Sequence, residues 1–153
     1  VQRNIGIGGD GSMRMNLGEL ETATTYGLPV KILVLNNLGD GMVRQWQKIY
    51  FGKRFSGSDK SLRVKDFVKT AQADGFEFAA RVTDKARLKE MLREFVAFKG
   101  PAFLEVMIDP DACVYPMVGP GMGYREMVTG DYIVGRNPAE NVKEGPSRIT
   151  DSF

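Results

Sequence analysis

Hydrophobic residues along the chain follow two spacings, one typical of buried strands and one typical of amphipathic helices. Residues 30–35 form a nearly continuous apolar run, which is typical of a central parallel strand covered on both faces. Three further segments have the length and composition of buried strands. The four predicted strands are therefore residues 4–8, 30–35, 76–82 and 102–108.

Segments with apolar residues at helical spacing separate these strands. We expect Asn16 to cap the first helix, with the Glu19 side chain reaching back to the cap. Strands and helices alternate, which predicts an α/β fold with an open parallel sheet, flanking helices and right-handed crossovers. The predicted helices run from Asn16 to Tyr26, from Met42 to Tyr50, from Val64 to a stop at Gly75, and from a cap at Thr83 or Asp84 to a stop at Gly100.

The composition of the sequence changes after Asp109, where prolines and glycines become frequent and periodic segments become rare. We therefore predict a partial α/β domain over residues 1–109 and an irregular C-terminal arm over residues 110–153 that frays into disorder. Residues 52–62 are rich in Gly, Ser and Lys, which predicts a mobile, solvated loop. The chain opens on Val1 almost inside its first strand, so we expect missing upstream sequence and an uncovered apolar sheet edge.

Composition narrows the possible chemistry. The chain has no histidine, which excludes Ser-His-Asp and Cys-His catalysis and histidine metal ligation. The formal charge is +2, with basic and acidic residues interspersed, so we expect no nucleic-acid partner. No apolar stretch approaches the length of a membrane span, so we expect no membrane contact. The single cysteine, Cys113, excludes an internal disulfide and favours a cytoplasmic protein.

Two short polar motifs each follow a predicted strand. Gly9-Asp10-Gly11 follows the first strand, and Asn36-Asn37 closes the second. Ligands of open α/β sheets bind outside the carboxyl ends of the strands, so both motifs should face one crevice although 24 residues separate them. Each motif alone is usually just a turn, and the combination is much more specific.

The residue types in these motifs suit a diphosphate bridged by a metal ion. Glycines beside Asp10 allow close approach of an anion, and Ser12 adds a hydroxyl donor. The Asp10 carboxylate, the Asn37 amide oxygen and a backbone carbonyl near Gly39 provide the oxygen ligands that Mg²⁺ prefers.

The joined pattern resembles the signature of thiamine-diphosphate enzymes, and longer segments resemble acetolactate synthase (acetohydroxyacid synthase). The segment Gly41-Met42-Val43-Arg44-Gln45-Trp46-Gln47 distinguishes this family from other thiamine enzymes better than the joined pattern does. The resemblance covers roughly residues 1–130. Its other segments are Leu28 to Asn37, Lys99 to Val106 and Tyr115 to Val118.

The resemblance implies a role for particular residues. Asp10, Asn37 and the backbone oxygen of Gly39 match the metal ligands of the family. Trp46 matches the aromatic residue that lines the substrate pocket, and no catalytic residue is expected because the cofactor-activating glutamate lies outside this chain. The implied cofactor contacts are Gly9, Gly11, Ser12, Asp40, Gly41 and Met42.

The resemblance also implies a reaction and partners. The family decarboxylates pyruvate and joins the hydroxyethyl unit to a second 2-keto acid, pyruvate or 2-ketobutyrate, in branched-chain amino-acid biosynthesis. Thiamine diphosphate and Mg²⁺ are implied here, with FAD bound mostly outside this segment. A homo-oligomer with its site at a subunit interface and a possible regulatory subunit are implied, and we expect this chain alone to be inactive.

Other interpretations of the same residues stay open. The chain could belong to another thiamine-diphosphate carboligase or 2-keto-acid decarboxylase, or be a non-catalytic cofactor-binding module. Trp46 could simply pack on a helix face, and Arg44 could contact a substrate carboxylate, although surface or interface arginines are commoner. Glu105 lies inside an apolar strand, where we expect a structural hydrogen bond.

Overall fold

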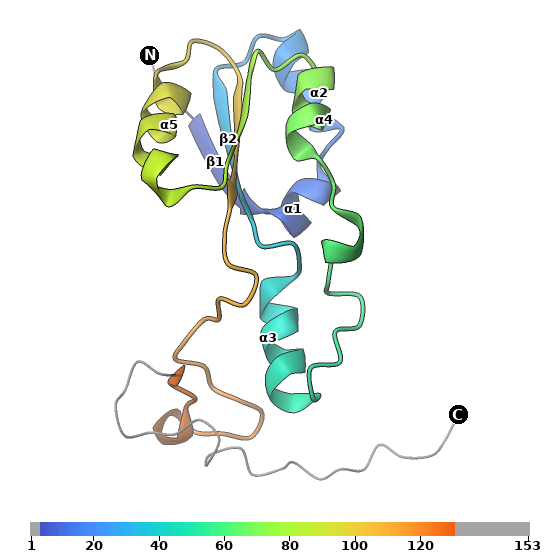
Figure 1. Cartoon of the computed structure of the whole chain (residues 1–153), viewed down its shortest axis with the longest axis vertical. Helices are drawn as coiled ribbons and strands as arrows, with labels where there is room; N and C mark the ends of the chain where they lie inside the picture. The colour runs from blue at the N-terminus through green and yellow to red at the C-terminus, as the bar shows by residue number, and fades with distance from the viewer. Residues whose placement is uncertain (1–3, 131–153) are drawn as a thin grey trace, which may run out of the picture.

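A computed structural model describes residues 4–130, which form an open parallel sheet at one end and a smaller group of segments at the other (Figure 1). All strand pairs are parallel, and the order across the sheet is β1-β2-β4-β3. This confirms the predicted fold class. The strands are β1 (Asn4–Gly9), β2 (Val30–Asn36), β3 (Phe78–Val82) and β4 (Ala102–Met107).

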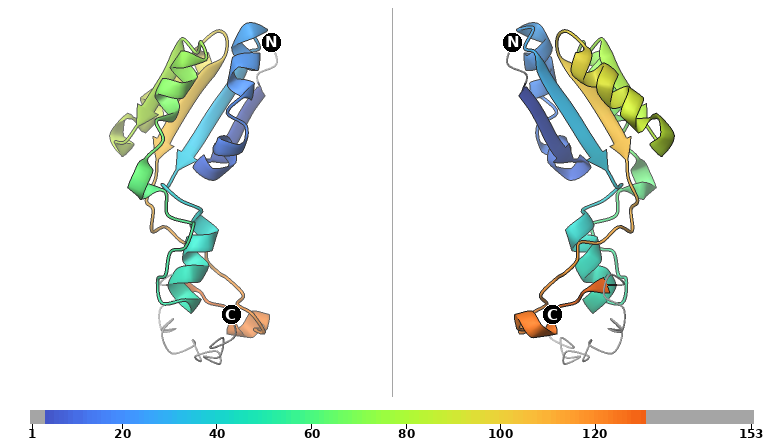
Figure 2. Two further views of the ribbon diagram at one scale, coloured as in Figure 1. Left: turned by 90° about the vertical axis from the view of Figure 1, so that its right-hand side faces the viewer. Right: turned by 90° about the vertical axis from the view of Figure 1, so that its left-hand side faces the viewer.

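Helices cover the two faces of the sheet unequally (Figures 1 and 2). Residues of α2 and α4 pack on one face around Val34 and Phe103, and α5 packs on the other face around Leu104.

Among residues 4–130, no helix is long and apolar enough to cross a membrane. The helices are α1 (Asp10–Met15), α2 (Glu19–Thr25), α3 (Gly41–Tyr50), α4 (Phe67–Ala73) and α5 (Lys85–Ala97), with the 3₁₀ turns η1 (Ser61–Arg63) and η2 (Tyr124–Glu126).

The edge strand β1 pairs with β2 alone and keeps part of its apolar surface uncovered. Ile5 is 46% exposed and Ile7 is 66% exposed, and both share a face with the exposed Leu35 of β2. On the same face, α5 packs on β3 and β4, and Leu33 of β2 joins the cluster beneath it. The expected uncovered apolar edge is therefore present.

The first predicted helix is wrong in its start and its continuity. Helix α1 begins at Asp10, directly after the extended Gly9, and Asn16 is its C-cap rather than the N-cap of a helix. A separate helix, α2, begins at Glu19 after Gly18. Asn16 and Gly18 are both poor helix formers, so the chain bends between them instead of continuing one helix.

The other boundaries differ by a few residues. Val64 is extended and lies outside α4, because the Asp66 side chain accepts a hydrogen bond from the Lys69 N–H at 3.2 Å and sets the start of that helix at Phe67. Asp84 caps α5 in the same way, as predicted. Gly75 ends α4 at a φ of +89°, a conformation that favours glycine.

The segment after β4 runs along α3, far from most of the sheet (Figure 2). The Gln45 side chain of α3 donates to the Val114 carbonyl and accepts from the Val114 N–H, both at 2.8 Å. Met117 and Val128 then pair in an antiparallel bridge. The remainder of the predicted arm, residues 131–153, lies outside the described residues.

Candidate functional site

The two polar motifs meet at the carboxyl ends of β1 and β2. These strands are neighbours in the sheet, with Gly9 in register with Leu35, so Asp10 and Asn36 each follow directly at the same edge. Asp10 is 1% exposed, and its Oδ2 has no hydrogen-bond partner among residues 4–130. A buried carboxylate oxygen without a donor is costly unless a cation or a proton reaches it.

Electrostatics at Asp10 favour a bound cation. Burial raises the pKa of the Asp10 carboxyl, and the nearby Asp40 carboxylate raises that pKa further. The Arg14 guanidinium and the backbone N–H groups of Asp10 and Asn37 oppose this rise in pKa without cancelling it. A metal ion beside Asp10 would reverse the balance and hold the carboxylate ionised.

Glycines allow the two turns to approach each other closely. A Cβ atom at Gly11 would lie 2.8 Å from Oδ1 of Asp40, and a Cβ at Gly41 would lie 2.6 Å from Nδ2 of Asn37. Real Cβ atoms do not approach other atoms so closely, so only glycine fits both positions without a shift. The Asn37 side chain is fixed from the other side, because its Oδ1 accepts from the Gly39 N–H at 3.2 Å.

The predicted site residues are therefore only partly brought together. The members of both turns lie at one strand edge, but Ser12 and Met42 have exposed side chains. Trp46 lies one turn further along α3, half-buried, with its ring 5.2 Å from the Tyr50 ring. No group of three or more acidic or cysteine side chains suited to a metal is present in residues 4–130, so a metal here would depend on amide and backbone oxygens.

The segment 58–60 belongs to the site and was missed, since we expected a mobile, solvated loop there. The Asp40 N–H donates to the Ser58 carbonyl at 2.9 Å, and the Lys60 N–H donates to the Leu38 carbonyl at 2.8 Å. Lys60 also forms an ion pair with Asp40, Nζ to Oδ2, at 3.3 Å. A loop composition of Gly, Ser and Lys carries no periodic signal from which this pairing could have been predicted.

A series of hydrogen-bonded polar side chains within the sheet stabilises the same strand edge. Glu105 of β4 is fully buried and accepts from Asn36 Nδ2 and Arg81 Nε, each at 2.6 Å. Asn36 Oδ1 in turn accepts from the Leu38 N–H at 2.8 Å, which holds the first residue of the loop after Asn37. The expected structural hydrogen bond at Glu105 is confirmed, and it connects the middle of the sheet to the site.

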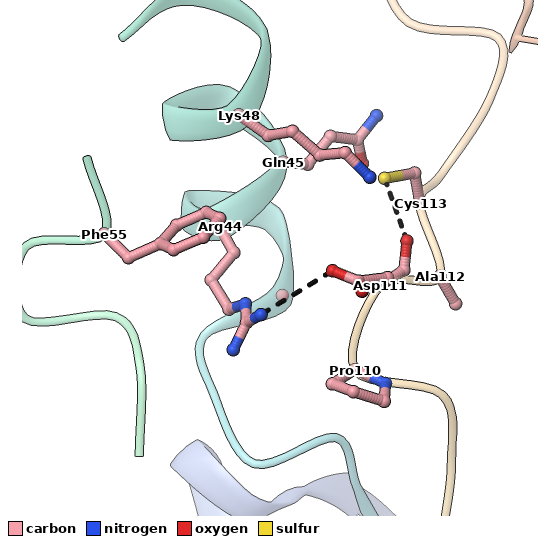
Figure 3. A pocket seen from close by; sticks show the side chains of 9 residues that line it. Arg44, Gln45, Lys48, Phe55, Pro110, Asp111, Ala112 and Cys113 are labelled. Carbon is pink, nitrogen blue, oxygen red and sulfur yellow. Dashed lines mark hydrogen bonds and ion pairs between the residues drawn. The ribbon is translucent and has the colours of Figure 1, made fainter. Parts of the chain in front are cut away.

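A small cavity lies beside α3, between that helix, Phe55 and the segment after β4 (Figure 3). Arg44 projects into it and forms an ion pair with Asp111, NH2 to Oδ1, at 3.7 Å. Arg44 also pairs with Asp59, NH1 to Oδ1, at 3.5 Å. Arg44 therefore joins three segments of this chain, a role that the sequence analysis did not predict.

Comparison with known proteins decides the family. The model of the family described as thiamine pyrophosphate enzyme, C-terminal TPP binding domain, matches residues 2–106. The chain belongs to this family. Thiamine pyrophosphate, which is thiamine diphosphate, is the cofactor of such domains, and the predicted cofactor is confirmed at that level.

Curated relatives of this TPP-binding domain carry the name expected from the sequence. The mitochondrial acetolactate synthase catalytic subunit of Saccharomyces cerevisiae is 43% identical over 136 residues, which cover 89% of this chain and 19% of that protein. The acetolactate synthase large subunit of Pyropia yezoensis is 38% identical over 124 residues, covering 81% and 21%. The chain thus spans about a fifth of the length of these relatives.

Solved structures share the same fold. The thiamine diphosphate-dependent 4-hydroxybenzoylformate decarboxylase of Rhodococcus jostii matches with a TM-score of 0.63 and 29% identity, covering 71% of this chain and 20% of that one. The benzoylformate decarboxylase of Polynucleobacter necessarius matches with the same TM-score and 23% identity, which supports the fold alone. The predicted family and open parallel sheet are confirmed by these comparisons.

Proposed function

We propose that this chain forms the thiamine-diphosphate- and Mg²⁺-binding part of an acetolactate synthase. The proposed reaction decarboxylates pyruvate and joins the product to a second 2-keto acid, pyruvate or 2-ketobutyrate, in branched-chain amino-acid biosynthesis. The observation that carries the binding role is the buried Asp10 oxygen without a donor, which lies at the same strand edge as Asn37. The identity to acetolactate synthases, 43% in one case, supports the choice of reaction.

The residues of the two turns fit a hydrated Mg²⁺ ion. We infer that Asp10, the Asn37 Oδ1 atom and the Gly39 carbonyl hold it, leaving other positions for phosphate oxygens and water. The Asn37 oxygen keeps a lone pair beyond its bond to the Gly39 N–H. Ionisation of Asp10 on metal binding makes the affinity fall as the pH is lowered, because burial favours the protonated carboxyl.

The start of α1 suits the diphosphate. The amides of Gly11 and Ser12 lie in the first turn of α1, where backbone N–H groups have no acceptor within the helix. We infer that these two residues and Gly9 contact the diphosphate, and that Asp40, Gly41 and Met42 line the bound cofactor. When bound, thiamine diphosphate supplies the carbanion chemistry, and these residues hold and orient it.

The remaining parts of the proposal concern the substrate pocket and groups outside residues 4–130. Trp46 is proposed to line the pocket of the acceptor 2-keto acid. The cofactor-activating glutamate, most of the FAD contacts and the subunit interface are assigned to other parts of a larger, oligomeric protein. A regulatory subunit and a cytoplasmic location stay predictions.

A second candidate is a 2-keto-acid decarboxylase that releases an aldehyde instead of joining two substrates. The likeness to the Rhodococcus jostii decarboxylase, at 29% identity, is the observation that favours it. The products formed from pyruvate by the full-length protein distinguish the two reactions. Acetolactate supports the synthase, and acetaldehyde as the main product supports the decarboxylase.

Calorimetric titration tests the cofactor site directly. We expect thiamine diphosphate to bind the wild-type chain only with Mg²⁺, and Asp10→Asn to weaken this binding at least about tenfold because it removes the ionised ligand. Asp74→Asn is the matched control, since it changes one carboxyl at the far end of α4. Equal affinity in wild type and Asp10→Asn, or binding that does not depend on Mg²⁺, would contradict the metal role.

A further inference from the structure

Gly39 occupies a very tight position between two neighbours from other parts of the chain. A Cβ atom there would lie 2.6 Å from the Ser58 carbonyl oxygen and 2.8 Å from Cδ of Arg44. The aliphatic stem of Arg44 therefore lies directly against the backbone of Gly39. Both neighbours fill the space that a side chain at position 39 would occupy, so we expect the direction of the Gly39 carbonyl to depend on where they are held.

The Arg44 side chain is itself held by several groups (Figure 3). Its side chain is 12% exposed, its guanidinium pairs with Asp59 at 3.5 Å and Asp111 at 3.7 Å, and it lies 4.8 Å from the centre of the Phe55 ring. A planar guanidinium stacks flat on a ring and directs separate N–H groups to two carboxylates, a geometry that a compact ammonium group does not reproduce.

Backbone contacts tie the same segments together. Gly39 and Asp59 form an antiparallel bridge, and the Asp40 carbonyl accepts from the Arg44 N–H at 2.9 Å. Leu38 has a φ of +59°, which costs free energy for a residue with a side chain. Contacts on both sides hold Leu38 in this conformation, through its N–H to Asn36 and its carbonyl to Lys60.

We propose that Arg44 is a positioning residue that fixes the Gly39 carbonyl in the direction required by the metal ion. The inference rests on the proposed function, in which that carbonyl is a ligand. Mg²⁺ demands a near-ideal octahedral geometry, so a carbonyl that turns freely is a poor ligand for it. Arg44 does not touch the ion and acts through packing on Gly39 and through its ion pair with Asp59.

Two substitutions separate the parts of this role. Arg44→Met keeps an aliphatic stem against Gly39 and removes the charge, whereas Arg44→Lys keeps the charge and loses the planar group. Lys48→Met is the matched control, because Lys48 lies one turn further along α3 and lines the same cavity. Mg²⁺ affinity is measured at saturating thiamine diphosphate, and amide hydrogen exchange is measured over residues 38–41.

We expect Arg44→Met to weaken Mg²⁺ binding about 10- to 100-fold, as loss of an outer-shell partner does, and to speed exchange of the 38–41 amides. Arg44→Lys should recover part of both effects, and Lys48→Met should change neither. Asp59→Asn should shift Mg²⁺ affinity in the same direction as Arg44→Met, since it removes one partner of the guanidinium.

The outcomes distinguish this inference from the proposed function. A wild-type chain that binds Mg²⁺ with the cofactor, together with Arg44 variants of unchanged Mg²⁺ affinity, would overturn the positioning role alone. Absence of Mg²⁺-dependent cofactor binding in the full-length protein would overturn the proposed function and this inference with it. Faster amide exchange with unchanged Mg²⁺ affinity would show that Arg44 stabilises the loop without positioning a ligand, which also contradicts the proposal.

Discussion

The sheet region and the α3 region of this chain are held together by different forces. The sheet region comprises β1 to β4 with α1, α2, α4 and α5, and it contains two clusters of buried apolar residues, one on each face. The α3 region comprises α3, residues 55–60 and residues 109–118. None of the buried residues in those two clusters lies in the α3 region.

Polar contacts take the place of a core in the α3 region. Gln45 is the buried residue of α3, and both ends of its amide bond the backbone of Val114. Arg44 joins the same region through two ion pairs. Regions with few apolar contacts open locally at a lower free energy than the core. The proposed metal loop lies between the two regions, so it is exposed to the movements of the less stable one.

The largest effect should come from the sheet region. Phe103 is fully buried and packs edge to face against Phe76, with ring centroids 6.2 Å apart. We expect Phe103→Ala to lower the free energy of unfolding by about 3–5 kcal/mol and the melting temperature by about 10 °C. Circular dichroism during heating measures the melting temperature. Phe51→Ala is the control, because Phe51 is 50% exposed, and an equal loss in both variants would contradict the comparison.

An intermediate, local effect should follow from changing Gln45. Gln45→Ala removes two hydrogen bonds to Val114, worth about 1–3 kcal/mol together. We expect faster amide exchange at Val114 with almost no change in the global melting temperature. Gln72→Ala, on the exposed face of α4, is the matched control. If Gln45→Ala lowered the melting temperature as much as Phe103→Ala, the α3 region would unfold together with the sheet.

The smallest expected effect is the pH dependence of stability that arises from Asp10, at the boundary of the two regions. Burial raises the pKa of Asp10, so the folded chain binds more protons than the unfolded chain between pH 3.8 and the higher folded pKa. Stability of the metal-free chain should therefore fall as the pH rises through this window. Asp10→Asn should remove the dependence and raise stability at neutral pH by about 1 kcal/mol, as changes at functional sites often do.

Asp66 serves as an internal control, because the pKa of its carboxyl is lowered whereas that of Asp10 is raised. A hydrogen bond from the Lys69 N–H is the main cause that lowers the pKa of Asp66, and Arg81 lowers it further. Its contribution to stability is present above pH 3.8 and is lost as the pH falls through the folded pKa. Urea unfolding with EDTA at several pH values measures how much each substitution changes the free energy of unfolding. This change should vary with pH in opposite directions for Asp10→Asn and Asp66→Asn. Slopes of the same sign would contradict the burial of an unpaired carboxyl at Asp10.

Sequence reasoning was most successful where apolar patterns and turns act over short distances. Continuous apolar runs such as residues 30–35 identify parallel strands, and the neighbouring ends of two such strands bring Asp10 and Asn37 to one edge. The helix start at Asp10 was missed, because an extended glycine replaced the side-chain cap that we expected at Asn16. Neither the metal nor the substrate roles are tested by the fold, and they stay predictions.

Contacts between distant loops could not be predicted in the same way. The pairing of residues 38–40 with 58–60 depends on backbone groups, which every residue has, so side-chain types gave no sign of it. The position of Arg44 depends on Asp59 and Asp111, which lie 15 and 67 residues further along the chain. Such long-range pairs require the folded geometry of the whole α3 region.

Trp46 has a practical consequence for measurement. It is the single tryptophan of the chain, and it lies on α3 against Tyr50, outside both apolar clusters. Its fluorescence therefore reports on the α3 region, whereas far-ultraviolet circular dichroism reports on the helices and strands of the entire chain. The protein thus carries an intrinsic optical probe outside its two apolar clusters, and no label has to be attached to follow the opening of that region.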